Sequence, residues 1–146
     1  MEICNSGKPI AIRLRGLPSF NYTTSISGRV EVFYSGKWGT ICDDGWDMND
    51  ARVACRQLGY KYGVRALRRD SVPDGTGQIW LDDVACSGNE LSLSSCPHNG
   101  WGNKNCGHSK DAGVECTSTG IVLLLDWLCE ILPSWSLNCV CDFISP

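Results

Sequence analysis

Six widely spaced cysteines constrain the fold of this chain more than any other feature. They are Cys42, Cys55, Cys86, Cys96, Cys106 and Cys116. No gap between neighbours matches the two-to-four-residue spacing with which two thiolates hold one tetrahedral zinc ion. An even number of such cysteines in one segment indicates a disulfide framework, although the spacing leaves several connectivities open. Because disulfides persist only in oxidising compartments, we expect the protein to work outside the cytosol.

The first residues lack the features of a secretory signal, since neither a basic n-region nor an apolar h-region follows Met1. We therefore expect a start further upstream, or a piece of a longer secreted or membrane-anchored protein. An extracellular location also makes Asn21, in the run Asn-Tyr-Thr, a predicted N-glycosylation site. The sequence predicts no pairing for the remaining cysteines, which are Cys4, Cys129, Cys139 and Cys141.

Composition is compatible with one small, turn-rich domain. The 146 residues suffice for one domain with short appendages. The chain has 16 glycines but only three phenylalanines, which favours a core that depends on cross-links. A formal net charge of −3 is too small to imply a nucleic-acid partner.

Hydrophobic periodicity predicts several short strands, with Ser35-Gly36 as a hairpin turn. Residues 61–77 are basic and then rich in glycine and proline, so we expect a long exposed loop there. The strands are expected at 10–15, 30–34, 38–42, 79–81 and 113–116.

One helix is expected between the third and fourth strands. Asn49 suits its N-cap, Asp50 suits the positive end of the helix dipole, and Gly59 suits a left-handed C-cap. Residues at i, i+3, i+4 and i+7 form a stripe that we expect to be buried. These residues are Ala51, Ala54, Cys55 and Leu58.

The end of the chain, residues 118–146, is an apolar tail. Pro133 would end a helix there after about 12 residues, or about 18 Å. A helix that crosses a bilayer needs about 30 Å, so we predict no membrane span in this chain.

Five runs of the sequence resemble the scavenger receptor cysteine-rich (SRCR) domain. They are GRVEVFYSGKWGTICDDGW at 28–46, ARVACRQLGY at 51–60, IWLDDVAC at 79–86, CPHNGW at 96–101 and CGHSKDAGVEC at 106–116. The resemblance covers residues 10–117, and it leaves 1–9 as an N-terminal linker and 118–146 as the tail.

The resemblance implies an α+β fold in which a curved antiparallel sheet cradles one helix. In the six-cysteine, group A-like form of the family, the implied disulfides are Cys42–Cys106, Cys55–Cys116 and Cys86–Cys96. Members of the family are mostly non-catalytic recognition modules of secreted and cell-surface proteins. They bind proteins, microbial surfaces and polyanions, often with bound calcium.

Two aspartate pairs are candidate cation ligands, since hard cations such as calcium require converging oxygen atoms. The resemblance implies a first site on Asp43, Asp44 and a glutamate, but Lys110 replaces the glutamate and could neutralise Asp43 instead. We therefore expect calcium at the second set rather than the first. The alternative is that these aspartates only accept backbone N–H bonds in turns. The second set is intact and comprises Asp44, Asp82, Asp83 and Asn105.

A basic cluster is the candidate anion-binding surface. Arg65, Arg68 and Arg69 offer planar guanidinium forks that match sulfate, phosphate and carboxylate groups. The cluster could be extended by Arg52, Arg56 and Lys61. The alternative is an ordinary solvated basic face.

A second candidate ligand surface is the segment Val30-Glu-Val-Phe with Trp38, which resembles one that bacteria-binding members use. We interpret its apolar residues as core, and we keep Glu31 and Lys37 as candidate ligand-binding residues.

Catalysis has little support in the sequence. The two histidines, His98 and His108, lie in turn-rich segments, and no catalytic motif is present. We predict an extracellular, non-catalytic module that binds polyanionic, microbial or protein surfaces with the help of calcium. The alternative is a structural or adaptor domain for protein–protein interaction in a larger protein, such as one with a protease domain.

Overall fold

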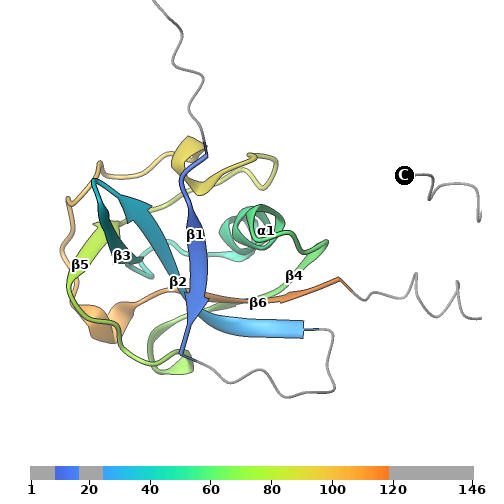
Figure 1. Ribbon diagram of the computed structural model, residues 1–146, viewed down its shortest axis with the longest axis horizontal. Helices are drawn as coiled ribbons and strands as arrows, with labels where there is room; N and C mark the ends of the chain where they lie inside the picture. The colour runs from blue at the N-terminus through green and yellow to red at the C-terminus, as the bar shows by residue number, and fades with distance from the viewer. Residues whose placement is uncertain (1–8, 17–24, 119–146) are drawn as a thin grey trace, which may run out of the picture.

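The computed structural model describes residues 9–16 and 25–118. Its strands form one curved sheet in the order β4-β6-β2-β3-β5, and β1 also pairs with β2 (Figure 1). Only β3 and β5 are parallel; the other pairs are antiparallel. The strands are β1 (Ile12–Arg15), β2 (Ser25–Tyr34), β3 (Lys37–Ile41), β4 (Tyr62–Leu67), β5 (Gln78–Leu81) and β6 (Gly113–Thr117).

One α-helix, α1 (Met48–Gln57), packs against β4 and β6, as Figure 1 shows. Three short 3-10 helices accompany it in the described part of the chain. They are η1 (Arg69–Ser71), η2 (Leu93–Ser95) and η3 (His108–Lys110). This arrangement confirms the predicted α+β fold. None of the described helices is long and apolar enough to cross a membrane.

The predicted β2–β3 hairpin is present. Ser35 and Gly36 have φ values of 48° and 79°, and Tyr34 pairs with Lys37 across this two-residue turn. Two positive φ values in succession match the right-handed twist of the flanking strands. The hairpin strand β2 carries Val30 and Val32, which are fully buried, as the core interpretation of that segment expected. That interpretation was wrong for Phe33, which is 40% exposed, because successive side chains of a strand point to opposite faces of the sheet.

Helix α1 begins two residues earlier than predicted, with Asp47 as its N-cap. Asp47 Oδ1 accepts from the backbone N–H groups of Asn49 and Asp50, at 2.8 and 3.3 Å. In return, Asp50 Oδ2 accepts from the N–H of Asp47 at 2.7 Å. The prediction of Asn49 was wrong because two aspartates three residues apart form a reciprocal capping box, which satisfies more N–H groups than one asparagine could.

The other end of the helix is as predicted. Gly59 has a φ of 92°, and the N–H of Tyr60 donates to the carbonyl of Cys55 at 2.9 Å, which completes a left-handed cap. Of the predicted stripe, Ala51, Ala54 and Cys55 are buried and Leu58 is half-buried.

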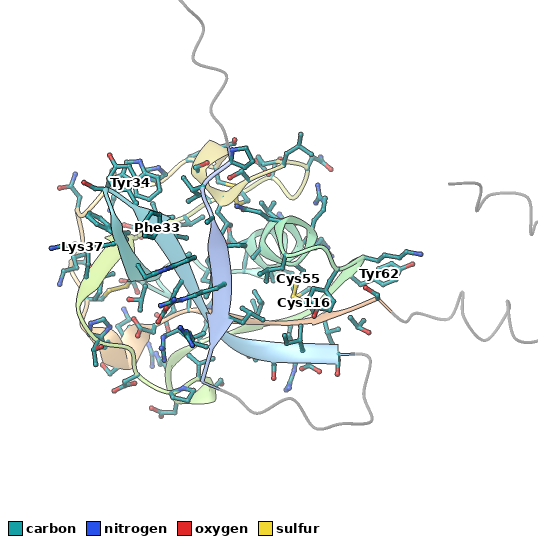
Figure 2. All side chains as sticks on the ribbon, in the orientation of Figure 1. Phe33, Tyr34, Lys37, Cys55, Tyr62 and Cys116 are labelled. Carbon is teal, nitrogen blue, oxygen red and sulfur yellow. A yellow bond between two sulfur atoms is a disulfide. The ribbon has the colours of Figure 1, made fainter. Side chains whose placement is uncertain are left out.

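The three expected disulfides are present: Cys42–Cys106, Cys55–Cys116 and Cys86–Cys96. Figure 2 shows the second of them joining α1 to β6. Beside the helix, Trp46 is fully buried and its Nε1 donates to the carbonyl of Gly113 at 2.9 Å. A sulfur bridge and a buried indole thus hold the helix against the sheet.

The expected loop at 61–77 was wrong in its first part, because β4 occupies Tyr62–Leu67 and pairs with β6. The residues of β4 do not alternate between buried and exposed positions, since only Leu67 is buried and most of the others face solvent. The strand forms because it pairs with β6 and packs against α1. The local sequence does not reveal these tertiary contacts. Asn21, residues 119–146 of the tail and the four remaining cysteines lie outside the described residues.

Asp50 gives the fold a testable pH dependence. Its side chain is fully buried and accepts from the N–H of Cys86 at 2.8 Å, and burial raises the pKa of Asp50 from 3.8 to about 6. Between these values the folded state binds more protons than the unfolded chain, so stability falls as pH rises through this window. We expect the free energy of unfolding of the wild type, relative to that of the Asp50→Asn variant, to fall by up to about 3 kcal/mol from pH 4 to pH 6. Urea unfolding at several pH values measures this difference, and a constant difference would contradict the prediction.

Candidate functional site

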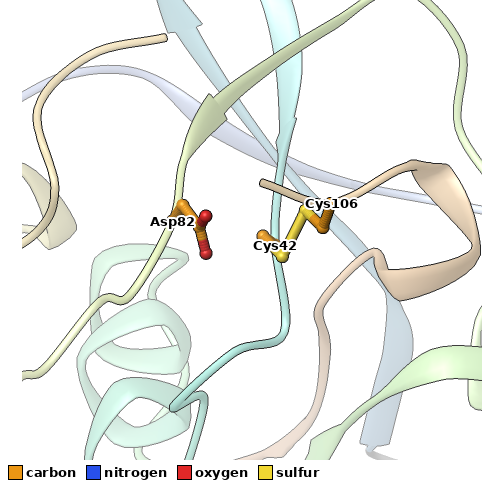
Figure 3. Close-up of side chains that lie close together, drawn as sticks. All are labelled: Cys42, Asp82 and Cys106. Atoms are coloured by element: carbon orange, nitrogen blue, oxygen red, sulfur yellow. A yellow bond between two sulfur atoms is a disulfide. The ribbon is translucent and has the colours of Figure 1, made fainter. Parts of the chain in front are cut away.

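The loops that follow β3 and β5 bring the predicted cation ligands together. These strands are parallel, so their carboxyl ends meet at one edge, and the N–H of Cys42 donates to the carbonyl of Leu81 at 2.8 Å. The Cys42–Cys106 disulfide draws the loop before Cys106 to the same place. Figure 3 shows the Asp82 carboxylate facing this disulfide.

Three of the four expected ligands converge. Asp82 is fully buried, and its two oxygens accept from the backbone N–H groups of Asp83, at 2.8 Å, and Asn105, at 3.1 Å. One terminal atom of the Asn105 amide lies 3.2 Å from both Asp82 Oδ2 and Asp44 Oδ2. With nitrogen in this position the amide donates to both carboxylates, whereas a bound cation would need the amide oxygen there. Two carboxylates and an amide oxygen are donor types that calcium takes, and Asp44, Asp82 and Asn105 are the residues that would hold it.

The fourth expected ligand is engaged elsewhere. Asp83 is exposed and has a φ of 52°, and its Oδ2 accepts from Asn99 Nδ2 at 2.5 Å. The Asp83 side chain thus hydrogen-bonds to the loop before Trp101, and it does not lie with the carboxylate oxygens of Asp44 and Asp82.

Lys110 occupies the place between the first pair of aspartates. Its Nζ donates to Asp44 Oδ1 and lies 3.9 Å from Asp43 Oδ1. Asp43 itself is buried, and its Oδ2 accepts from the N–H of Arg69 at 3.0 Å. An ammonium group therefore stands where the first cation would need a carboxylate, although it contacts Asp44 more closely than the expected Asp43.

The predicted basic cluster separates into groups with different environments. Arg65 Nε pairs with Glu115 Oε2 at 2.6 Å across β4 and β6. Arg68 and Arg69 are exposed, and neither makes an ion pair with a described residue. Because its backbone N–H binds Asp43, Arg69 lies beside the acidic loop. Arg52 belongs to the exposed face of α1.

The hairpin surface holds one buried and one exposed candidate. Glu31 is only 7% exposed and accepts from Arg13 Nε at 2.7 Å and from Arg29 Nη2 at 2.9 Å. Burial alone would raise the pKa of Glu31, but the two guanidinium groups lower it below its usual range. Lys37 is exposed at the turn, and Phe33, on the same side of the molecule in Figure 2, is 40% exposed.

The two histidines bind backbone groups, as expected for turn segments. His98 Nδ1 accepts from the N–H of Gly100 at 2.9 Å, and burial lowers the pKa of His98. His108 Nε2 lies 3.0 Å from the carbonyl of Gly77, and its Nδ1 lies 3.0 Å from Asp111 Oδ2. Asp111 is a structural residue that sequence reasoning missed: it is buried and also accepts from the N–H of Gly75 at 2.7 Å.

Comparison with known proteins gives consistent matches. A family model of the scavenger receptor cysteine-rich domain matches residues 20–117. A scavenger receptor cysteine-rich domain superfamily protein of Patiria pectinifera is 54% identical over 89 residues, which are 61% of this chain and 8% of that protein. The macrophage receptor MARCO of Mus musculus is 60% identical over 90 residues, which are 62% of this chain and 17% of the receptor. The match therefore concerns one domain of much longer proteins.

Solved structures agree with this match. The SRCR domain of mouse MARCO, crystallised in a dimeric form, is 57% identical with a TM-score of 0.60, over 64% of this chain and 88% of that chain. The third SRCR domain of murine neurotrypsin is 44% identical with a TM-score of 0.62, over 76% of this chain and 98% of that chain. The sequence runs, the disulfide pairs and these matches all agree, and the chain belongs to the scavenger receptor cysteine-rich family.

Proposed function

We propose that this chain is an extracellular, non-catalytic module that binds polyanionic ligands on microbial, glycan or protein surfaces with the help of calcium. The observation that carries the proposal is the contact between the acidic loop and the arginine loop. Asp43 accepts from the backbone N–H of Arg69, so the segment that carries the exposed side chains of Arg68 and Arg69 contacts the loop that supplies Asp44. The three disulfides support an extracellular location.

The chemistry of both groups suits an anion. Arg68 and Arg69 have no described carboxylate partner, so their forks are available for two-point contacts with sulfate or phosphate. A calcium ion held by Asp44, Asp82 and Asn105 would add positive charge to a loop that otherwise repels anions. Binding should therefore need both the arginines and the ion.

Binding to immobilised dextran sulfate tests the proposal. We expect the Arg68→Ala/Arg69→Ala variant to lose at least about tenfold in affinity, because each charge-assisted contact contributes about 1.5–3 kcal/mol. Chelation of calcium should weaken wild-type binding, and added calcium should restore it.

Two control variants identify the surface that is used. Arg68→Lys/Arg69→Lys keeps both positive charges but removes the planar guanidinium groups that make two-point contacts. We expect its affinity for dextran sulfate to lie between those of the wild type and the double alanine variant. Lys37→Ala removes one charge from the hairpin surface and should leave the affinity unchanged. Binding that is indifferent to both chelation and the double alanine variant would overturn the proposal and favour the adaptor alternative.

A further inference from the structure

We propose a second anion site, separate from the Arg68/Arg69 surface, in the groove between α1 and β4. The groove has a volume of about 150 Å³, and its lining consists of Arg52, Arg56, Lys61, Tyr62 and Gly63. We infer that it binds one negatively charged sugar residue of a glycan, which carries a sulfate or a carboxylate group.

The three cations of this groove lack anionic partners in the described part of the chain. Arg52 Nη1 donates to the amide oxygen of Asn49 at 2.8 Å, and Arg56 donates to the carbonyls of Gly88 and Glu90. These neutral contacts orient the guanidinium groups without cancelling their charge. An anion in the groove would therefore be attracted by all three side chains.

The one carboxylate of the neighbouring loop is already engaged. Glu90 accepts from the N–H groups of Ser87 and Gly88 at 2.7 and 3.0 Å. These bonds lower the pKa of Glu90 to about 2, so it stays ionised and bound to its own loop. Arg56 contacts the backbone carbonyl of Glu90 and not its side chain.

The spacing of the arginines adds a reason for an anion to bind. Arg52 and Arg56 lie four residues apart on the exposed face of α1, where like charges are neighbours and repel each other. A bound anion between them would turn this repulsion into two attractive contacts. Arg65 of β4, by contrast, is already neutralised by Glu115.

The shape of the groove favours a sugar over a bare inorganic anion. At Gly63 the strand approaches the helix so closely that a Cβ atom would lie 3.2 Å from Ala51 C and Arg52 N, so the absent side chain lets the two elements meet at the groove. A register shift of β4 follows between Gly63 and Arg65. Tyr62, 41% exposed, offers an aromatic face with a polar tip beside the cations, which suits the apolar face and hydroxyl groups of a sugar ring.

The groove is distant from the other two candidate surfaces. Figure 2 shows Tyr62 at the α1 side of the molecule, while Phe33, Tyr34 and Lys37 lie at the opposite side. Tyr62 begins β4 and Arg68 follows its end, so the strand separates them by about 20 Å. The groove contains no predicted calcium ligand, so its binding should be insensitive to chelation.

Titration of the isotope-labelled full chain by NMR tests this site. The probes are N-acetylglucosamine 6-sulfate, glucuronic acid, uncharged N-acetylglucosamine and inorganic sulfate, each added in the presence of a chelator. We expect the amide signals of Tyr62 and Gly63 to shift with the two charged sugars, and to shift much less with the uncharged sugar or with sulfate.

Variants of groove residues complete the test. Arg52→Ala/Lys61→Ala should weaken charged-sugar binding at least about tenfold, and it spares Arg56, which also holds the carbonyls of Gly88 and Glu90. Tyr62→Ala should weaken sugar binding but not sulfate binding. Arg68→Ala/Arg69→Ala removes two charges outside the groove, and it should leave the shifts of Tyr62 and Gly63 unchanged although it weakens dextran sulfate binding. If the amide signals outside the groove are the same in a variant as in the wild type, that variant is folded.

Several outcomes would overturn the inference. Equal shifts with sulfate and the charged sugars would show a general anion site without sugar selectivity. The groove binds none of the probes if the amide signal of Gly63 does not shift with any of them. The same conclusion follows if the Arg52→Ala/Lys61→Ala variant binds the charged sugars with unchanged affinity. Each of these results leaves the dextran sulfate test of Arg68 and Arg69 unaffected, so the two proposals can fail separately.

Discussion

Replacing Cys55 and Cys116 together by alanine should lower the free energy of unfolding by about 4 kcal/mol. The bridge joins residues 61 positions apart, and its removal gives the unfolded chain a large gain in conformational freedom. It also frees α1 from β6 on the side where β4 packs. Denaturant unfolding of both proteins without reductant measures the difference.

The short disulfide provides the control for this prediction. Cys86 and Cys96 are only ten positions apart, and the Cys86→Ala/Cys96→Ala variant should lose about 3 kcal/mol. A larger loss from the short bridge than from the long one would contradict the loop-closure explanation. Stability would then depend more on local packing of the sulfur atoms than on the length of chain that they close.

Replacing Lys110 by glutamate should raise the number of bound calcium ions from one to two. The change removes the ammonium group from Asp44 and adds a carboxylate beside Asp43 and Asp44. Three carboxylates would then face one another, which is the kind of set that a hard cation needs. Isothermal titration calorimetry with calcium gives the stoichiometry directly.

The neutral variant Lys110→Met separates the loss of the positive charge from the gain of a ligand. It should keep one calcium ion per chain but bind it about tenfold more tightly, since Lys110 no longer competes for Asp44. Asp82→Asn should abolish calcium binding at the set of Asp44, Asp82 and Asn105 in all of these backgrounds, because Asp82 is the buried carboxylate of that set. The same stoichiometry in wild type and Lys110→Glu would show that Asp43 and Asp44 form no second cation site and that Asp43 serves the loop structure alone.

Local features of the sequence were enough to predict most of the framework. The Ser35-Gly36 turn, the Gly59 cap and the buried stripe of α1 each depend on residues within one turn or one helix, and the structure contains all three. The motif runs around the six cysteines were long enough to imply the disulfide pairs through the family resemblance.

The composition of the candidate site depended on contacts between distant residues. Nothing in the local sequence shows that Asp83 binds Asn99, or that Lys110 reaches Asp44 rather than Asp43. The basic residues of 52–69 looked like one cluster, yet β4 separates Arg68 from Arg52 and pairs Arg65 with Glu115.

The amino-acid sequence by itself determined the family and the turns of this protein, because these depend on residue type and short spacing, and the disulfide pairs followed only from the family resemblance. The tertiary structure alone decided that 62–67 is a strand and that Tyr62 and Gly63 form a groove with α1. The physical reason is that β4 has weak local periodicity, and its place is set by hydrogen bonding to β6 and by the close approach of Gly63 to the helix backbone.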